Sequence, residues 1–373
     1  MSSQVTPFEV KGKVDYDQLV NEFGVKLINQ ELLQRFEKVT GHKPHRLLRR
    51  GIFFAHRDLE LILNDYEAKR PIFIYTGRGP SGPLHIGHYI PLEFTVWLQK
   101  VFATYVMFQI ADDEKYYFKD LTREQVSDMS WELVYELEAL GFNLNKTSIF
   151  FNSEYKHTES FAQVVDIIMK RVSLNTIQNI FGLDQSANIG QLTWPIYQTS
   201  AAFSVAYSYN DLPLDKQFKH STRCLVVYAI DQDVYFRLAR DVAYKINDRK
   251  PCSIISKFLP TLTGDGKMSS TNDTEVVITL QDTPAQIKKK INKYAFSGGR
   301  DTLEEHRKLG GNVDVDIPYQ YLCHFLEDDE ELAKIREEYT TGIMTSGEIK
   351  AKCIEVISQI TEGHREKLSV VKG

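Results

Sequence analysis

A histidine pair and a separate lysine loop could act together on a phosphorylated substrate. The segment His85-Ile86-Gly87-His88 follows a glycine- and proline-rich stretch, Gly77–Leu84. Its imidazoles could donate hydrogen bonds to oxygens that gain charge as a phosphate is displaced, and its glycine would let a nucleotide approach the backbone. The second segment, Gly264–Ser270, carries Lys267, a cation that could neutralise a pyrophosphate leaving group.

Neither segment is specific when it is taken alone. With 10 histidines and 21 glycines in 373 residues, an H-x-G-H match arises by chance in about one or two of every hundred such chains. A lone lysine in a glycine-rich loop is usually solvated. Both segments differ from a Walker A loop and from the G-x-G-x-x-G fingerprint, which argues against an ordinary NTPase and against a nucleotide-dependent oxidoreductase.

Strands and helices alternate around the histidine pair. We expect strands at short β-branched or aromatic runs, residues 72–76, 104–110, 148–151 and 224–230. We expect helices at residues 86–102, 122–141, 160–172 and 234–243. Such alternation is typical of a parallel sheet that is wound on both faces. The loops at residues 77–83, 111–115 and 231–233 should therefore line one pocket at the carboxyl edge of the sheet.

The two ends of the chain have other patterns. Residues 1–70 combine helical stretches at 17–23 and 30–39 with a basic segment at 43–58. Beyond residue 282 the strand signals cease, and helices are expected at residues 283–296, 318–326, 329–339 and 346–368. The sequence thus predicts an α/β fold with three parts. These are a mixed N-terminal extension over residues 1–70 that packs on the next part, a Rossmann-like, doubly wound parallel sheet over residues 71–282, and a helical domain over residues 283–373.

The composition is that of an ordinary globular chain. Hydrophobic residues make up 42%, charged residues 25%, and the net charge is −5, so a nucleic acid would have to meet a local basic patch. No apolar run reaches the roughly 18 residues of a membrane span, and the first residues lack an apolar signal core. Four cysteines lie far apart, which is typical of reduced thiols. We expect a cytoplasmic protein with no membrane partner.

Taken together, the two segments match the paired HIGH and KMSS signature of class I aminoacyl-tRNA synthetases. From about residue 6 to 365 the chain resembles the eukaryotic type of tryptophanyl-tRNA synthetase. The motifs that carry this resemblance are TPFEV, LLRRGIFFAHRD, YTGRGPSGPLHIGH, QIADDEKYYFKD, AIDQDVYFRLARD and AFSGGRDTLEEHRKLGGNVDVD. The resemblance implies activation of L-tryptophan with ATP and Mg²⁺, transfer of the aminoacyl group to tRNA(Trp), and no metal held tightly by the protein itself.

The resemblance also implies roles for individual residues. The catalytic groups would be His85, His88 and Lys267. ATP would be bound by Thr76, Gly77, Arg78, Gly79, Gly87, Asp231, Gln232, Met268 and Ser269. Tryptophan would be bound by Tyr75 and Gln109 at the indole nitrogen and by Glu114, Lys115, Gln198 and Gln232 elsewhere. The chain departs from the common KMSKS pattern at Ser270, which leaves Lys267 as the only cation of that motif.

A tyrosyl-tRNA synthetase shares both signatures and is the nearest alternative. Enzymes of that kind tend to carry Q-x-x-D after the pocket glutamine, whereas this chain has the sequence QTSA at residues 198–201. Without that carboxylate a buried phenol would lack its acceptor, at a cost of about 1–3 kcal/mol, so tryptophan is favoured. A non-catalytic, synthetase-like binding protein is the alternative from another class, and the two histidines and the lysine argue against it.

The resemblance further implies a homodimer and tRNA recognition by the helical C-terminal part. We expect residues 283–373 to read the anticodon. The basic stretches Lys288–Lys290 and Lys43–Arg57 could contact tRNA phosphates, although lysines on a helix usually form only a solvated face.

Overall fold

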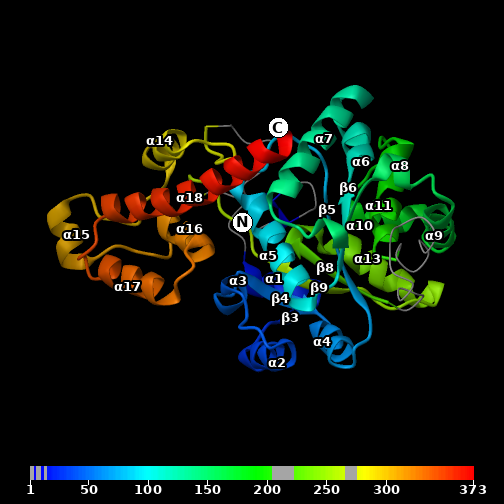
Figure 1. Cartoon of the computed structure of the whole chain (residues 1–373), viewed down its shortest axis with the longest axis horizontal. Helices are drawn as coiled ribbons and strands as arrows, with labels where there is room; N and C mark the ends of the chain where they lie inside the picture. Colours follow the sequence, from blue (N-terminus) through cyan, green and yellow to red (C-terminus); the bar gives the residue numbers. More distant parts are fainter. Residues whose placement is uncertain (1–3, 6–9, 12–14, 204–221, 265–274) are drawn as a thin grey trace.

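Seven strands form one sheet at the centre of the molecule (Figure 1). The computed structural model describes residues 4–5, 10–11, 15–203, 222–264 and 275–373. Across the sheet the strands follow the order β3 (Lys26–Leu27), β4 (Phe53–Arg57), β9 (Cys252–Ser256), β8 (Arg223–Ala229), β5 (Ile72–Arg78), β6 (Tyr105–Ile110) and β7 (Thr147–Phe151). The five strands from β9 to β7 are parallel, and β3 and β4 run antiparallel to their neighbours. A separate two-stranded ribbon joins β1 (Gln4–Val5) to β2 (Val10–Lys11).

Helices connect these strands and continue beyond them. Those before β5 are α1 (Tyr16–Phe23), α2 (Gln30–Thr40), α3 (Arg46–Arg49) and α4 (Leu59–Glu67). Those from β5 to β9 are α5 (Ile86–Phe102), α6 (Asp112–Phe118), α7 (Arg123–Ala139), α8 (Asn152–Tyr155), α9 (Glu159–Met169), α10 (Leu174–Phe181), α11 (Ile189–Ala201) and α13 (Asp233–Ala243), with short 3₁₀ turns at Leu144–Lys146, Ile230–Gln232 and Tyr244–Ile246. The last five are α14 (Pro284–Tyr294), α15 (Leu303–Leu309), α16 (Ile317–Phe325), α17 (Asp329–Thr340) and α18 (Ser346–Lys372).

Helices cover both faces of the sheet because successive side chains of a strand point to opposite sides. In β5, Ile72 and Ile74 enter a core that also contains side chains of α4, α5 and α7. The alternate residues, Phe73 and Tyr75, enter a second core with side chains of α9, α11 and α13. The expected doubly wound α/β fold is therefore confirmed.

Most of the expected elements occur within a few residues of their expected bounds, and a capping box at Thr122 opens α7. All three expected loops are wrong at least in part. Residues 231 and 232 belong to the 3₁₀ turn Ile230–Gln232, and α13 begins at Asp233. Residues 111–115 are mostly helical, because α6 begins at Asp112 directly after β6. Gly77 and Arg78 extend β5 and pair with Gln109 and Ile110 of β6. A Cβ atom on Gly77 would lie 2.7 Å from the carbonyl oxygen of Gln109, so glycine here allows close pairing of two strands rather than a turn.

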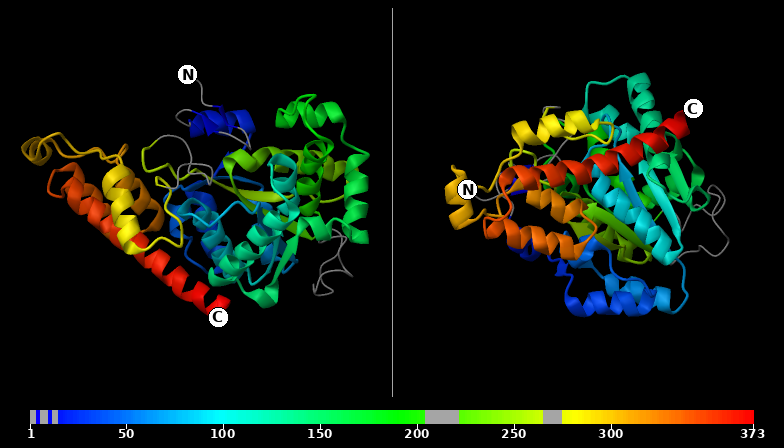
Figure 2. Two further views of the ribbon diagram at one scale, coloured as in Figure 1. Left: turned by 90° about the horizontal axis from the view of Figure 1, so that it is seen from above. Right: turned by 60° about the vertical axis from the view of Figure 1, so that its left-hand side comes forward.

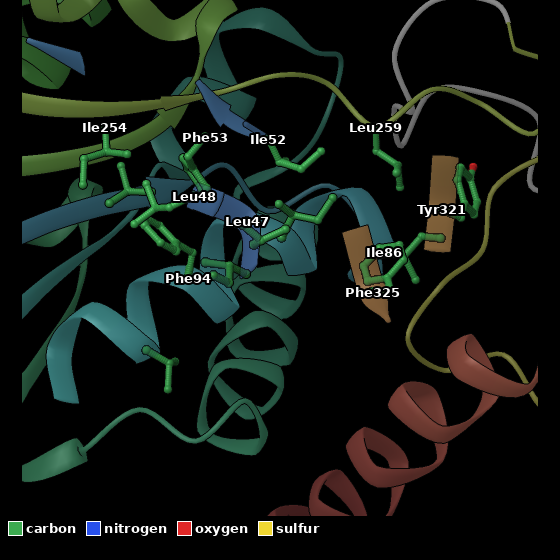
Figure 3. Close-up of a cluster of buried hydrophobic side chains, with 14 of the residues drawn as sticks. Leu47, Leu48, Ile52, Phe53, Ile86, Phe94, Ile254, Leu259, Tyr321 and Phe325 are labelled. Carbon is green, nitrogen blue, oxygen red and sulfur yellow. The ribbon is translucent and has the colours of Figure 1, made fainter. Parts of the chain in front are cut away.

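One apolar core joins the sheet to the C-terminal helices. Figure 3 shows this cluster, in which Phe53 and Phe94 stack at 4.0 Å and Ile86, at the start of α5, lies beside Phe325 of α16. The long helix α18 packs on α14 and α16 and also on α7 of the α/β part, as two further views show (Figure 2). None of the described helices is long and apolar enough to cross a membrane.

Candidate active site

A cleft of about 330 Å³ opens at the carboxyl edge of the parallel strands. All three segments that were expected to share a pocket contribute to it, so that expectation is confirmed. The residues singled out from the sequence that line this cleft are Thr76, Gly77, Arg78, Gly79, His85, Gly87, His88, Glu114, Lys115, Asp231 and Gln232. Lys267, Met268 and Ser269 lie outside the described residues.

The two histidines cap the first turn of α5. The backbone N–H of His88 donates to Nδ1 of His85 at 3.3 Å, and the backbone N–H of His85 donates to Nδ1 of His88 at 3.4 Å. Their rings stack with centroids 3.4 Å apart. This reciprocal capping fixes both imidazoles at the helix N-terminus, where the helix dipole favours an anion.

An isolated antiparallel β-bridge between His85 and Thr279 fixes the start of α5. The backbone N–H of Ile86 donates to the carbonyl of Ile278 at 3.0 Å, and that of Leu280 donates to the carbonyl of Leu84 at 2.7 Å. The carboxylate of Glu136 on α7 accepts from the backbone N–H of Leu84 and from the side chain of Gln281. These bonds attach the chain at residues 278–281 to the segment that carries the histidines.

Arg78 brings a partly buried cation to the cleft. Among the described residues its guanidinium donates only long bonds, at 3.4 Å, to Ser81 and to the carbonyl of Gly82. No carboxylate of the described residues forms an ion pair with it. Burial lowers the pKa of Arg78 to about 10, against the opposing attraction of Glu136. A partly buried guanidinium in this situation favours an anionic ligand.

Gly79 packs directly on the start of α6. A Cβ atom there would lie 2.5 Å from Cε of Lys115 and 2.7 Å from a carboxylate oxygen of Glu114. These two side chains form an ion pair at 3.6 Å and are about one-fifth exposed. The glycine therefore lets a carboxylate and an ammonium group reach the wall of the cleft.

A smaller hollow of about 60 Å³ continues the cleft between β5, α11 and α13. Its walls include Glu114, Gln198 and Gln232, three residues that the sequence associates with the amino acid. Trp194 and Tyr235 also line it and were not predicted. Both are buried aromatic residues inside helices, and their sequence pattern is that of ordinary core positions.

Tyr75 and Gln109 lie next to each other on β5 and β6, each two residues before a residue that lines this hollow, Gly77 or Ala111. Both are almost fully buried on neighbouring strands, and the Tyr75 hydroxyl donates to Oε1 of Gln109 at 2.6 Å. Burial raises the pKa of Tyr75 well above its usual range, so the phenol keeps its proton. Neither side chain belongs to the walls of the cleft or of the hollow.

Lys257 is a cleft residue that sequence reasoning missed. It follows β9 and lines the same cleft, with its ammonium group 5.5 Å from the ring of Tyr16 and 5.7 Å from that of Phe54. Burial lowers its pKa. The signal in the sequence is weak: Lys257 follows the short segment CSIIS, residues 252–256, which forms β9.

Most arginines of the basic N-terminal segment bind carboxylates of the protein itself. Arg46 pairs with Glu93 and Glu327, and Arg49 and Arg50 pair with Asp329. Contact of this segment with tRNA phosphates stays a prediction. These three arginines are already paired within the protein, whereas Lys43 is exposed.

In the second basic stretch, Lys288–Lys290, one lysine is paired within the protein and two are exposed. Lys290 donates to Asp282 and to the carbonyl of Val277. Lys288 and Lys289 are exposed on α14, so they remain available to a phosphate.

Within the described parts of the chain, no group of three His, Cys, Asp or Glu side chains could hold a metal ion.

The fold, the capped histidine pair and the cleft define a class I synthetase catalytic part. The sequence matches the family of class I tRNA synthetases for tryptophan and tyrosine (W and Y) over residues 67–362. The chain belongs to this family, and its relatives assign it to the tryptophanyl branch.

The cytoplasmic tryptophan–tRNA ligase of Homo sapiens is 46% identical over 95% of this chain and 74% of its own length. The cytoplasmic enzyme of Dictyostelium discoideum is 46% identical over 97% of this chain and 91% of its own length. Among solved structures, the tryptophanyl-tRNA synthetase of Encephalitozoon cuniculi bound to tryptophan has a TM-score of 0.87 at 39% identity and covers 96% of this chain and 95% of that one.

Proposed function

We propose that this chain activates L-tryptophan with ATP and transfers it to the 3′ end of tRNA(Trp). The observation that carries the proposal is the meeting of the capped histidines with Asp231 and Gln232 in one cleft at the carboxyl edge of the sheet. The names of the relatives point to the same substrate. In the first step a carboxylate oxygen of tryptophan attacks the α-phosphorus of ATP, the bond to the β-phosphate breaks, and pyrophosphate leaves.

The protein acts in this step by positioning and by charge stabilisation. His85 and His88 donate to phosphate oxygens as charge moves onto them. Arg78 and Lys267 offset the charge of the phosphates, with Met268 and Ser269 forming the loop around the nucleotide. Thr76, Gly77, Gly79 and Gly87 leave space for ATP against the backbone, and Asp231 and Gln232 bind the ribose.

Recognition of the amino acid uses the hollow beside the cleft. Glu114 and Gln198 hold the α-ammonium group, with Gln232 near them, and Lys115 lies near the carboxylate or the phosphates. Tyr75 and Gln109 accept from the indole N–H. The buried Ala201 replaces the carboxylate expected of a tyrosine enzyme, which supports tryptophan over the tyrosyl alternative.

Mg²⁺ would accompany ATP. Since the described residues offer no cluster of protein ligands, its oxygen ligands would come mainly from the phosphates and water. When bound, the ion would neutralise phosphate charge.

The proposal also covers tRNA binding, the oligomeric state and the cellular location of the protein. Residues 283–373, next to the catalytic part over residues 71–282 and the extension over residues 1–70, would form the anticodon-binding domain. We expect a cytoplasmic homodimer. The names of relatives support the compartment, and the exposed Trp131, whose ring lies 5.1 Å from that of Phe151 in the edge strand β7, supports a contact between two copies. Light scattering should give twice the 43.0 kDa of one chain, and Trp131→Glu should yield monomers.

ATP–pyrophosphate exchange tests the reaction itself. Purified protein should exchange pyrophosphate with tryptophan and not with tyrosine or with no amino acid. Exchange with tyrosine would move the substrate to the tyrosyl alternative. A folded protein that binds ATP and exchanges with neither would be a non-catalytic relative.

A further inference from the structure

A chain of four hydrogen bonds connects the buried end of the amino-acid site to an ion pair on its far side. Tyr75 donates to Oε1 of Gln109 at 2.6 Å, and Nε2 of Gln109 donates to Oδ1 of Asn152 at 2.9 Å. Nδ2 of Asn152 donates to Oδ2 of Asp113 at 2.8 Å, and the ammonium group of Lys156 donates to the same oxygen at 3.1 Å. All of these side chains except Lys156 are at most 4% exposed.

The charge at one end determines the direction of every bond in this chain. A carboxylate can only accept, so Asn152 must turn its NH₂ group toward Asp113. Its carbonyl oxygen then faces Gln109, which must present its own NH₂ group in turn. The oxygen of the Gln109 amide is thereby fixed on the side of Tyr75, where the free lone pairs of the amide and the phenol are acceptors.

We propose that Asp113 is a positioning residue which, through Asn152, orients the amide of Gln109 so that the buried end of the site presents acceptors to an N–H donor. This inference rests on the proposed function, in which Tyr75 and Gln109 meet the indole nitrogen. With the amide reversed, its NH₂ group would face the indole N–H, and two donors would oppose each other in a buried part of the protein. Asp113 thus favours a substrate whose side chain donates a hydrogen bond to Tyr75 and Gln109.

Lys156 keeps Asp113 ionised in this buried position. Burial raises the pKa of Asp113, and the neighbouring Asp112 acts in the same direction, whereas Lys156 and the bond from Asn152 oppose it. The ammonium group is in turn held by the hydroxyl of Tyr117 at 3.0 Å and lies 5.3 Å from the ring centres of Tyr117 and Tyr197. Without the cation, the pKa of Asp113 would rise further. A protonated carboxyl group could donate to Asn152, so the hydrogen bonds from Asp113 to Tyr75 would no longer have one fixed direction.

The test compares tryptophan with its benzothiophene isostere, β-(benzothiophen-3-yl)alanine, in which sulfur replaces the N–H. The quantity measured is the ratio of kcat/KM for the two amino acids in ATP–pyrophosphate exchange. In Asp113→Asn the new amide can bond to Asn152 in either direction, so this ratio should fall by about ten- to a hundredfold. A change that only loosened the fold would lower both values together and leave the ratio unchanged.

Matched variants complete the design. Asp112→Asn makes the same change one residue away, where the side chain accepts only from the backbone N–H of Ser153 at 2.9 Å, and it should keep the ratio within threefold of the parent. Lys156→Met should lower the ratio as Asp113→Asn does, while Lys156→Arg, which retains the cation, should restore it. If Asp113→Asn does not fold, the comparison of Lys156→Met with Lys156→Arg still tests the positioning role of Asp113.

The outcomes separate this inference from the proposed function. If the parent protein shows no exchange that depends on tryptophan, the proposed function fails. If the parent exchanges with tryptophan and rejects the isostere, but Asp113→Asn and Lys156→Met keep the parental ratio within threefold, the positioning role of Asp113 is overturned.

Discussion

The guanidinium of Arg46 contacts both carboxylate oxygens of Glu93, each at 2.8 Å. Arg46 lies on α3, and Glu93 lies on α5, the helix whose start carries the capped pair His85 and His88. The same guanidinium donates to the carbonyl of His324 and to Glu327, at the end of α16 and just beyond it. One side chain, 2% exposed, therefore links the N-terminal part, the active-site helix and the C-terminal helices.

Replacing Arg46 by methionine should destabilise the protein by about 3 kcal/mol, because the substitution leaves the partly buried Glu93 without its arginine partner. Burial already raises the pKa of Glu93, and Arg46 is the group that opposes this. Urea unfolding at neutral pH measures the loss. Lys334→Ala is the control, since it removes an ion pair with a side chain 72% exposed and should change stability by at most about 0.5 kcal/mol. A loss in Arg46→Met no larger than in this control would contradict the assignment.

The His88→Ala variant should lose ATP–pyrophosphate exchange by about 10²–10³-fold, as expected when one preorganised donor is removed. His42→Ala provides the comparison, because that histidine is exposed and lies outside the cleft. Both variants should fold, which thermal melting checks. An exchange rate within threefold of the parent would rule out a catalytic role for His88.

The helical surface at α14 should contribute to tRNA charging through two lysines rather than three. A Lys288→Ala/Lys289→Ala double variant should weaken aminoacylation and reduce its salt dependence, since each phosphate contact adds to the slope. It should spare adenylate formation. Lys170→Ala/Arg171→Ala, an exposed pair after α9 at the opposite end of the molecule (Figure 1), is the matched control. Equal losses of charging in the two double variants would argue against a specific role of α14.

The sequence was sufficient for the parts of the fold in which local pattern and tertiary environment agree. The apolar run at residues 72–76 and the glycine-rich loop before His85 predicted β5 and the start of α5, because a buried strand and a helix N-terminus have clear local signals. The short strands β4 and β9 were missed. Residues 53–57 lie in a basic segment, and their burial depends on pairing with residues 253–256, about 200 positions away.

Contacts between residues far apart in the sequence also explain which features of the site the sequence does not predict. Lys257 reaches the cleft only because β9 lies beside β8, which no local pattern shows. The bond from Gln109 to Asn152 joins residues 43 positions apart, and it depends on the register of β6 against β7. Residue types and motif positions could be predicted from the sequence, whereas hydrogen-bond partners required the packed structure.

His364 on α18 should make the protein less stable in mild acid. It is buried, and neither ring nitrogen has a hydrogen-bond partner among the described residues. Burial, followed by the charge of Lys367, lowers the pKa of His364 to about 4, whereas an unfolded histidine titrates near pH 6.5. Between these values the unfolded chain binds more protons, so the free energy of unfolding falls as the pH is lowered from about 6.5 to 4.

His364→Leu should remove this part of the acid sensitivity. Between pH 6 and 5 the free energy of unfolding, measured with urea, should depend on pH less steeply in the variant than in the parent, by about 1 kcal/mol per pH unit. Above about pH 7.5 the two curves should run parallel, because the imidazole is then neutral in both the folded and the unfolded chain. Parallel curves between pH 6 and 5 as well would mean that His364 accepts a proton as readily in the folded protein as in the unfolded one.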